Sequence, residues 1–219
     1  MRPENAAFVG MPGTGKSFSA RLRCEAHPRV VYLDPLDSAY AGHSARPGEK
    51  WSHVFSAANL AGLVHLIQHG PPSFRATYQA GELDRADRTD AIEQVCAVVA
   101  GSAPRGSWTT LVIDEIGVMF PRSGAGAAAA VEPVERLLRV GRHPRHRVCV
   151  YLISQRAVDL PPTMRALCEV VQIRRQSERV DLDRLDSIER GLGERARQLR
   201  EHDYLELRDG EIRGPLSAV

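Results

Sequence analysis

Residues 10–17 read Gly10-Met11-Pro12-Gly13-Thr14-Gly15-Lys16-Ser17, which fits the phosphate-binding pattern G-x-x-x-x-G-K-[ST]. A short apolar run at residues 6–9 precedes this P-loop pattern, and a helix-like stretch at residues 17–24 follows it. This strand, loop and helix order suits the chemistry, because glycines let backbone N–H groups surround phosphate oxygens and the helix N-terminus adds a positive dipole. The stretch therefore predicts a nucleoside triphosphate site.

The polar side chains of the P-loop have distinct expected roles. Lys16 should reach the β- and γ-phosphates, and the Ser17 hydroxyl should bind Mg²⁺. The rest of the loop should contact the nucleotide through Gly10, Pro12, Gly13, Thr14 and Gly15. The expected cofactors are therefore ATP and Mg²⁺.

The composition predicts a globular protein that is not basic overall. The chain has 219 residues, 43% of them hydrophobic, and a formal net charge of +2, so a surface for a polyanion must come from local clustering. We expect one domain over residues 1–219, with a C-terminal helix and hairpin at about 181–213 packed on it. The four cysteines are scattered without C-x-x-C spacing, which predicts reduced thiols and a cytoplasmic protein. No apolar run reaches the roughly 18 residues of a membrane span, and the N-terminus lacks a signal-like apolar core.

Strand-like and helix-like runs alternate along the chain. Strands are expected at residues 6–9, 30–33, 74–78, 110–113 and 148–153. Helical spacing marks two apolar sets, namely Leu60, Leu63, Val64 and Ile67, and Val134, Leu137 and Leu138. This alternation predicts an α/β fold, a RecA-like three-layer P-loop domain with a central, mostly parallel sheet.

Two further segments have expected structures. The low-complexity residues 123–130 predict a flexible loop that enters a helix. Near the C-terminus, helical spacing continues from Leu182 to Leu192, and two strand-like runs flank Asp209-Gly210, which predicts a hairpin.

A second motif is the apolar run at residues 110–113 followed by Asp114 and Glu115, which is the Walker B pattern. Asp114 would hold the Mg²⁺ shell at the carboxyl end of its strand, where α/β sheets bind ligands. Glu115 would act as the general base on the attacking water. An adjacent glutamate favours hydrolysis over a kinase reaction, because a kinase has less need of a water activator.

Two other strands also end in polar residues. The run at 148–153 leads into Ser154 and Gln155, and we expect this strand beside the P-loop strand, where Gln155 would sense the γ-phosphate. The alternative is a polar strand end that enters a turn. The run at 30–33 leads into Asp34, which would support the water or the outer shell of the metal, or would open a turn before Pro35.

Basic residues cluster between the helix at 134–138 and the strand at 148–153, namely Arg136, Arg139, Arg142, His143, Arg145, His146 and Arg147. Three interpretations stay open: a solvated helix face and loop, phosphate contacts to nucleic acid, and an arginine finger that reaches a neighbouring subunit's γ-phosphate. Arg142 is the first candidate for the finger and Arg139 the second.

The segment around Gln155 resembles the FtsK–HerA superfamily of DNA-pumping ATPases. Members have a Gly-Arg pair, an apolar strand, an [ST]-Q-R-P turn and then an edge strand; this chain has Gly141-Arg142, Ser154-Gln155-Arg156 and, at 170–173, a matching last strand. Ala157 stands where the family commonly has proline. The resemblance extends from Ala6 to Ile212.

The resemblance carries expectations about function. Without a membrane segment or an appended domain, the chain is similar to the genome-packaging ATPases of internal-membrane-containing, tectivirus-type viruses. The resemblance implies a homo-oligomeric ring, a hexamer, that moves double-stranded DNA into a capsid, with capsid or portal proteins as partners, in the host cytoplasm or at a packaging vertex. The alternatives are a related ATPase for protein or phage extrusion and a nucleotide-dependent binding switch.

Overall fold

The computed structural model describes residues 3–36, 53–102, 107–120 and 125–217, apart from the side chains of 125–130. Its centre is a nine-stranded sheet with the strand order β3-β4-β2-β5-β6-β1-β7-β8-β9. The strands are β1 (Ala6–Val9), β2 (Arg29–Asp34), β3 (His53–Phe55), β4 (Phe74–Gln79), β5 (Thr109–Ile113), β6 (Val148–Ser154), β7 (Val170–Arg174), β8 (Asp203–Arg208) and β9 (Glu211–Ser217).

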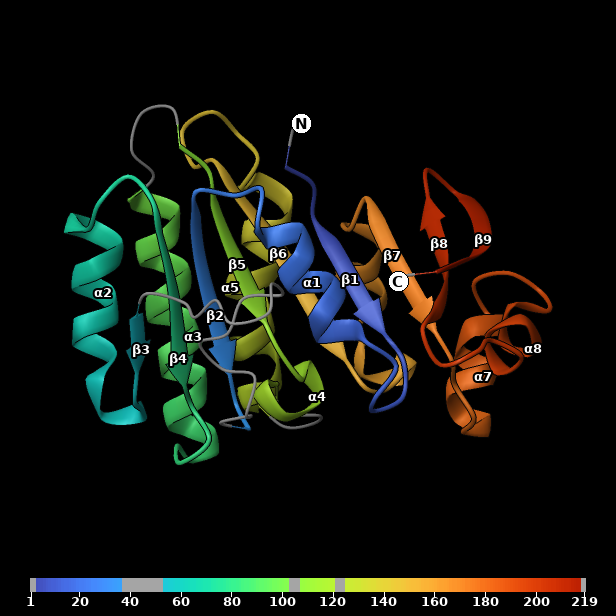
Figure 1. Cartoon of the computed structure of the whole chain (residues 1–219). Coiled ribbons are helices and arrows are strands. Elements are labelled where there is room, and N and C mark those ends of the chain that lie inside the picture. Colours follow the sequence, from blue (N-terminus) through green and yellow to red (C-terminus); the bar gives the residue numbers. More distant parts are fainter. Residues whose placement is uncertain (1–2, 37–52, 103–106, 121–124, 218–219) are drawn as a thin grey trace.

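Helices connect the strands and cover both faces of the sheet (Figure 1). The α-helices are α1 (Lys16–Cys24), α2 (Leu60–His69), α3 (Arg85–Gly101), α4 (Ile116–Met119), α5 (Ala125–Val140), α6 (Pro162–Ala166), α7 (Arg179–Asp186) and α8 (Leu192–Arg197). Short 3₁₀ turns lie at η1 (Ala57–Asn59) and η2 (Ala157–Asp159). Helix α1 lies on one face of the sheet and α3 and α5 on the other, so the predicted three-layer α/β fold is confirmed.

The sheet is parallel from β3 to β7, and only the hairpin β8–β9 runs antiparallel. All the parallel strands therefore end at one edge, called here the carboxyl edge, and begin at the opposite amino edge. Strand β1 lies between β6 and β7, with Val9 level with Ser154 and with Ile173. The P-loop, which follows β1, therefore leaves the sheet between the ends of two neighbouring strands, as ligand-binding loops do in this class of fold.

Alternate residues of the central strands face opposite sides of the sheet. In β1, Phe8 packs with Ala20 and Cys24 of α1, whereas Val9 belongs to the larger apolar cluster under α2, α3 and α5. Both kinds of residue are almost fully buried, which explains why the sequence of β1 is apolar throughout. Truncation of Phe8 to alanine should cost about 3–5 kcal/mol of the free energy of unfolding.

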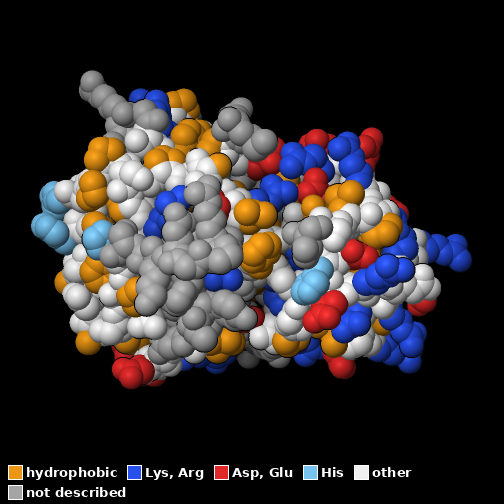
Figure 2. All heavy atoms as spheres, viewed as in Figure 1, with side chains coloured by type: hydrophobic (Ala, Val, Ile, Leu, Met, Phe, Trp, Pro, Cys, Tyr) orange, Lys and Arg blue, Asp and Glu red, His pale blue; other side chains and the backbone are white. Residues whose placement is uncertain are grey.

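The C-terminal segment joins the same sheet and the same core. Strand β8 pairs with β7, and the larger cluster also contains Leu185 of α7, Leu192 of α8 and Leu205 of β8. The space-filling view shows charged side chains of both signs gathered over this end of the molecule (Figure 2). The C-terminal end of the molecule therefore has mixed charge on the face seen in Figure 2, and not a continuous positive surface.

The structure corrects three expectations. Strand β7 is not an edge strand, because β8 pairs along its outer side and the hairpin extends the sheet. The helical pattern from Leu182 to Leu192 is two helices, because α7 ends at Asp186 and Gly191 adopts a left-handed φ of 84° before α8. Residues 125–130 already form the start of α5 rather than a loop, while 121–124 lie outside the described residues.

Candidate nucleotide-hydrolysis site

The P-loop forms a tight turn between β1 and α1. Gly13 and Gly15 have left-handed φ angles of 78° and 87°. Residues that carry a Cβ adopt such angles only with strain. The Thr14 hydroxyl and the Lys16 ammonium both donate to the carbonyl of Met11, at 2.8 and 2.9 Å. The loop is thus curled back on itself at the start of α1, with Lys16 only 6% exposed and Pro12 on the outside.

The two acids of the predicted Walker B motif lie within electrostatic reach of Lys16. Burial lowers the pKa of Lys16, whereas the negative charges of Glu115 and Asp114 raise it. Lysine and acids come from segments about 100 residues apart, and they meet because β5 and β1 both flank β6 and end at the carboxyl edge. The central spatial expectation from the two motifs is therefore met.

Asp114 is buried, and its carboxylate accepts three hydrogen bonds. The Ser17 hydroxyl donates to its Oδ2 at 3.4 Å, the Tyr32 hydroxyl donates to the same oxygen, and the Glu115 amide donates to Oδ1 at 2.9 Å. Burial raises the pKa of Asp114, and the hydrogen bond from Tyr32 opposes that shift. A carboxylate facing a hydroxyl at this spacing provides the hard oxygen ligands that Mg²⁺ prefers, so Ser17 and Asp114 fit the ion.

Glu115 sits at a strained point of the chain and is half-buried. It has a left-handed backbone conformation, φ 45° and ψ 61°, at the start of α4. Its Oε1 accepts a hydrogen bond of 2.9 Å from Nε2 of Gln155. Burial raises the pKa of Glu115, and the hydrogen bond from Gln155 lowers it. A non-glycine residue held in this conformation is typical of functional sites, because the surrounding structure must compensate for the strain.

Gln155 follows the strand next to β1, as expected. The Gly10 amide donates to the Ser154 carbonyl at 3.2 Å, which ties the end of β6 to the start of the P-loop. Asp181 of α7 accepts from the Val158 amide at 3.0 Å and from Arg156 at 3.1 Å. The segment that carries Gln155 is therefore fixed both to the P-loop and to the C-terminal helices.

Asp34 lies at the carboxyl edge and also opens a turn. Its Oδ1 accepts from the Leu36 amide at 3.1 Å, which matches the turn interpretation. It is 1% exposed, and its charge is one of the secondary causes that raise the pKa of Asp114 after burial. Asp34 is therefore close to the proposed metal ligand, and its support of water or metal stays a prediction.

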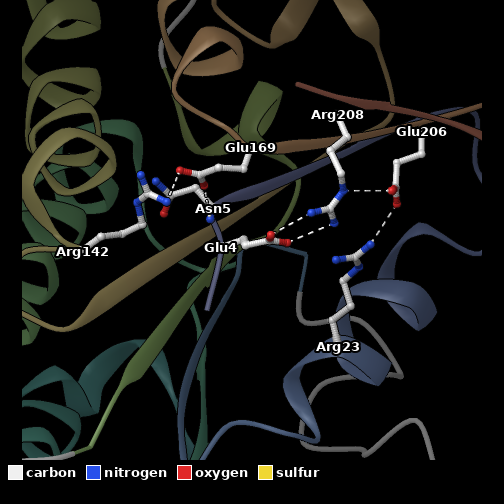
Figure 3. Close-up of polar contacts among 7 residues, drawn as sticks. All are labelled: Glu4, Asn5, Arg23, Arg142, Glu169, Glu206 and Arg208. Atoms are coloured by element: carbon white, nitrogen blue, oxygen red, sulfur yellow. Dashed lines mark hydrogen bonds and ion pairs between the residues drawn. The ribbon is translucent and has the colours of Figure 1, made fainter. Parts of the chain in front are cut away.

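The two arginine-finger candidates lie away from the P-loop of their own chain. Arg142 follows α5 at the amino edge and forms an ion pair of 2.5 Å with Glu169, which also accepts from the Asn5 amide (Figure 3). Arg139 pairs with Glu135 along α5 at 3.7 Å. Either arginine would have to serve a nucleotide on another subunit, so both roles stay predictions.

Two residues at the site were not expected from the sequence. Tyr32 lies in the apolar run of β2, where an aromatic residue indicates only a strand, yet its hydroxyl contacts Asp114. Arg174 ends β7 and donates to the carbonyl of Thr14 in the P-loop. An arginine at the end of an apolar strand was the only available signal for the second residue.

Two other kinds of feature are absent from the described residues. Within the described ranges, no helix combines the length and apolar character needed to cross a membrane. The same part of the chain holds no group of three or more histidines, cysteines or acids arranged to bind a metal ion.

Solved structures of similar fold include proteins of two icosahedral viruses. The genome-packaging NTPase B204 of Sulfolobus turreted icosahedral virus 2, in complex with AMPPCP, is 18% identical, with 99% of each chain covered and a TM-score of 0.67. Its complex with AMP gives a TM-score of 0.69 at 19% identity. The DNA-packaging ATPase B204 of Sulfolobus turreted icosahedral virus is 16% identical, with 99% of this chain and all of the other covered, and a TM-score of 0.65.

A likeness extends to larger proteins over part of their length. The pCW3 conjugation coupling protein TcpA is 13% identical over 96% of this chain and 59% of its own, with a TM-score of 0.58. No family model matches the chain, and no curated protein matches it. At these identities the comparisons establish the fold that the chain shares with these proteins.

Proposed function

We propose that this chain is an ATP-hydrolysing motor of the FtsK–HerA type that translocates double-stranded DNA, in the role of packaging a viral genome into a capsid. The observation that carries the proposal is the meeting of Lys16, Asp114, Glu115 and Gln155 at one edge of the sheet. The fold shared with the viral packaging NTPase over 99% of both chains supports it.

Each residue of the site has a specific part in this hydrolysis. Backbone N–H groups of the P-loop and the ammonium of Lys16 bind the phosphates, and Ser17 and Asp114 would hold Mg²⁺, which neutralises charge on the β- and γ-phosphates. Glu115 takes a proton from the attacking water. Gln155 orients the Glu115 carboxylate through the hydrogen bond between the two side chains.

The pairing of Glu115 with Gln155 favours hydrolysis over a binding switch. A switch needs no efficient water activation, whereas this site holds a half-buried carboxylate in a strained backbone and fixes it with an amide. Efficient turnover is the property that a motor needs.

The basic residues after α5, apart from the finger candidate Arg142, are the proposed contact with DNA. They border a hollow of about 560 Å³ lined by Arg139, Val140, Arg142, His143, Pro144, Arg145 and His146. Among the described residues its lining includes no acid, although Arg139 and Arg142 pair with Glu135 and Glu169 nearby. The charge of this lining contrasts with the mixed charge over the C-terminal helices in Figure 2. Electrostatic contacts to phosphates are independent of base sequence, which is what a motor that moves along any sequence needs.

A ring of identical subunits, a hexamer, completes the proposal. Arg142 lies at the amino edge, between the end of α5 and the start of β6, whereas its own P-loop lies at the carboxyl edge, so it would have to serve a triphosphate on a neighbouring subunit. A capsid or portal protein would then hold the ring during packaging.

The decisive experiment is an ATP turnover assay with and without duplex DNA, at low and high salt, with Lys16→Ala as the control. We expect turnover in the wild type, stimulation by DNA that weakens as salt rises, and none in Lys16→Ala. ATP turnover that is the same with and without DNA would favour the alternative of a related ATPase that drives protein or phage extrusion. Tight ATP binding with almost no turnover under any condition would favour a binding switch, and wild-type turnover in Lys16→Ala would reject the P-loop assignment.

A further inference from the structure

Arg174 lies directly behind the P-loop. It is the last residue of β7 and is fully buried. Its Nη1 donates to the carbonyls of Thr14 at 2.5 Å and of His202 at 3.2 Å, and its Nη2 donates to the Ser19 hydroxyl at 2.5 Å. One guanidinium thus joins the P-loop, the first turns of α1 and the segment that leads into β8.

The P-loop is packed so closely against this side chain that Gly10 has no room for a side chain of its own. A Cβ on Gly10 would lie 2.6 Å from the Cβ of Arg174, which is closer than real Cβ contacts. A Cβ on Gly15 would make only an ordinary contact with its Nη1, at 3.4 Å, so the need for glycine there comes from the φ of 87°. The absence of a side chain at Gly10 therefore lets the loop pack on Arg174, and Arg174 holds the Thr14 carbonyl by a hydrogen bond.

No carboxylate of the described residues pairs with the positive charge of Arg174. Within the described part of the chain, its hydrogen bonds go to carbonyl and hydroxyl oxygens, and its guanidinium carbon lies 5.2 Å from the centroid of the Tyr204 ring. Burial lowers the pKa of Arg174, but an arginine side chain keeps its proton in proteins. Its charge reaches the site, because it is one of the causes that lower the pKa of Lys16.

A buried cation normally has a nearby anion, since removing a charge from water is costly unless it is compensated. The sheet places Arg174 on the protein side of the turn whose amides are expected to face the phosphates. A triphosphate carries enough negative charge to compensate both Lys16 and Arg174 across the thin backbone layer of the loop.

We infer that Arg174 is a second cation of the triphosphate site, a positioning residue that orients the P-loop by its hydrogen bonds and strengthens phosphate binding by its charge. This rests on the proposed function, because it assumes that the loop binds a triphosphate. It assigns a role in ligand binding to a strand end outside both sequence motifs.

The test compares two buried arginines that differ in location. Arg29 at the start of β2 is also almost fully buried, donates to the Ile67 carbonyl and stacks on Phe74, but it lies at the amino edge. Arg174→Met and the matched control Arg29→Met each remove one such charge. The readouts are urea unfolding, and the dissociation constants for ATP and for inorganic tripolyphosphate without Mg²⁺, each at several salt concentrations.

We expect Arg174→Met to weaken tripolyphosphate binding by about tenfold or more and to flatten its salt dependence, because one positive charge near the ligand is lost. Arg29→Met should reduce stability but leave both binding properties unchanged. Arg174→Lys, which keeps the charge without the fork of donors, should keep the salt dependence and lose about threefold in affinity.

Unchanged affinity and salt dependence in folded Arg174→Met, or an equal loss in Arg29→Met, would overturn the inference. If Arg174→Met does not fold, Arg174→Gln replaces it, since glutamine keeps amide donors without the charge, and unchanged salt dependence there is equally contradictory. A wild-type chain that binds neither ATP nor tripolyphosphate would instead reject the proposed function.

Discussion

The amide of Gln155 donates to a carboxylate oxygen of Glu115 at 2.9 Å, although the two residues are 40 positions apart in the chain. They meet because β5 and β6 are neighbours in the sheet and both end at the carboxyl edge. A residue expected to sense the γ-phosphate and a residue expected to activate water are therefore one hydrogen-bonded unit. A substitution at either residue should therefore change the orientation of the other side chain.

The first prediction separates nucleotide binding from hydrolysis. Glu115→Gln should bind ATP as tightly as the wild type but hydrolyse it about 100-fold more slowly or worse, because an amide cannot take a proton from water. Gln155→Leu should show a smaller loss of turnover, since Glu115 remains but is no longer oriented. Single-turnover rates measured beside ATP affinities check both variants, and near-normal turnover in Glu115→Gln would mean that another base acts.

The second prediction concerns the hydroxyl of Tyr32, which contacts the carboxylate expected to hold Mg²⁺. Tyr32→Phe should raise the Mg²⁺ concentration needed for half-maximal turnover by about tenfold, because groups that orient metal ligands influence metal affinity on this scale. Tyr151→Phe is the matched control, since Tyr151 is a buried tyrosine of the same apolar cluster. An equal Mg²⁺ requirement in the two variants would show that the hydroxyl of Tyr32 does not orient Asp114.

The strands and motifs that could be predicted from the sequence are the ones that depend on short stretches of neighbouring residues. Central strands such as β1 and β6 are buried on both faces, so their apolar runs are visible without any tertiary knowledge. The carboxyl edge follows from their parallel order, which is why the proximity of Lys16 to the Walker B acids could be anticipated. Strand β3 was missed because it is only three residues long and partly exposed.

The rest depends on contacts between distant segments. Tyr32 lies in an apolar strand, and nothing in its neighbours indicates that its hydroxyl meets Asp114 from an adjacent strand. Whether β7 is an edge strand depends on where the hairpin β8–β9 docks, and an Asp-Gly turn predicts the hairpin but not its partner. The burial of Arg174 likewise arises from packing under the P-loop rather than from local sequence.

The third prediction is a loss of stability in mild acid caused by His27. Its Nδ1 contacts the Thr110 hydroxyl, and burial, together with the charges of Arg75 and Arg23, lowers its pKa below the ordinary value of 6.5. The unfolded chain therefore takes up a proton at a higher pH than the folded chain does. The free energy of unfolding should be unaffected above about pH 6.5 and should fall as the pH drops towards the pKa of folded His27.

Urea unfolding at pH 8 and pH 5.5 measures this effect. The difference between the two pH values should be smaller in His27→Gln than in the wild type, since glutamine cannot titrate. His69→Gln serves as the control, because His69 is exposed at the end of α2. A pH difference that is the same in His27→Gln and in the wild type would assign the acid sensitivity to other groups.

The fourth prediction tests whether Arg142 acts on a neighbouring subunit. Arg142 pairs with Glu169 and Arg208 pairs with Glu4, so the amino edge offers two partly exposed arginines in similar ion pairs (Figure 3). Only Arg142→Ala should lower turnover strongly while ATP binding persists, since an arginine finger stabilises charge in the transition state. Arg208→Ala should hydrolyse ATP normally. Rings mixed from Arg142→Ala and Lys16→Ala chains should recover part of the activity, because an intact P-loop then meets an intact arginine, and well-formed mixed rings without recovery would exclude Arg142 as the finger.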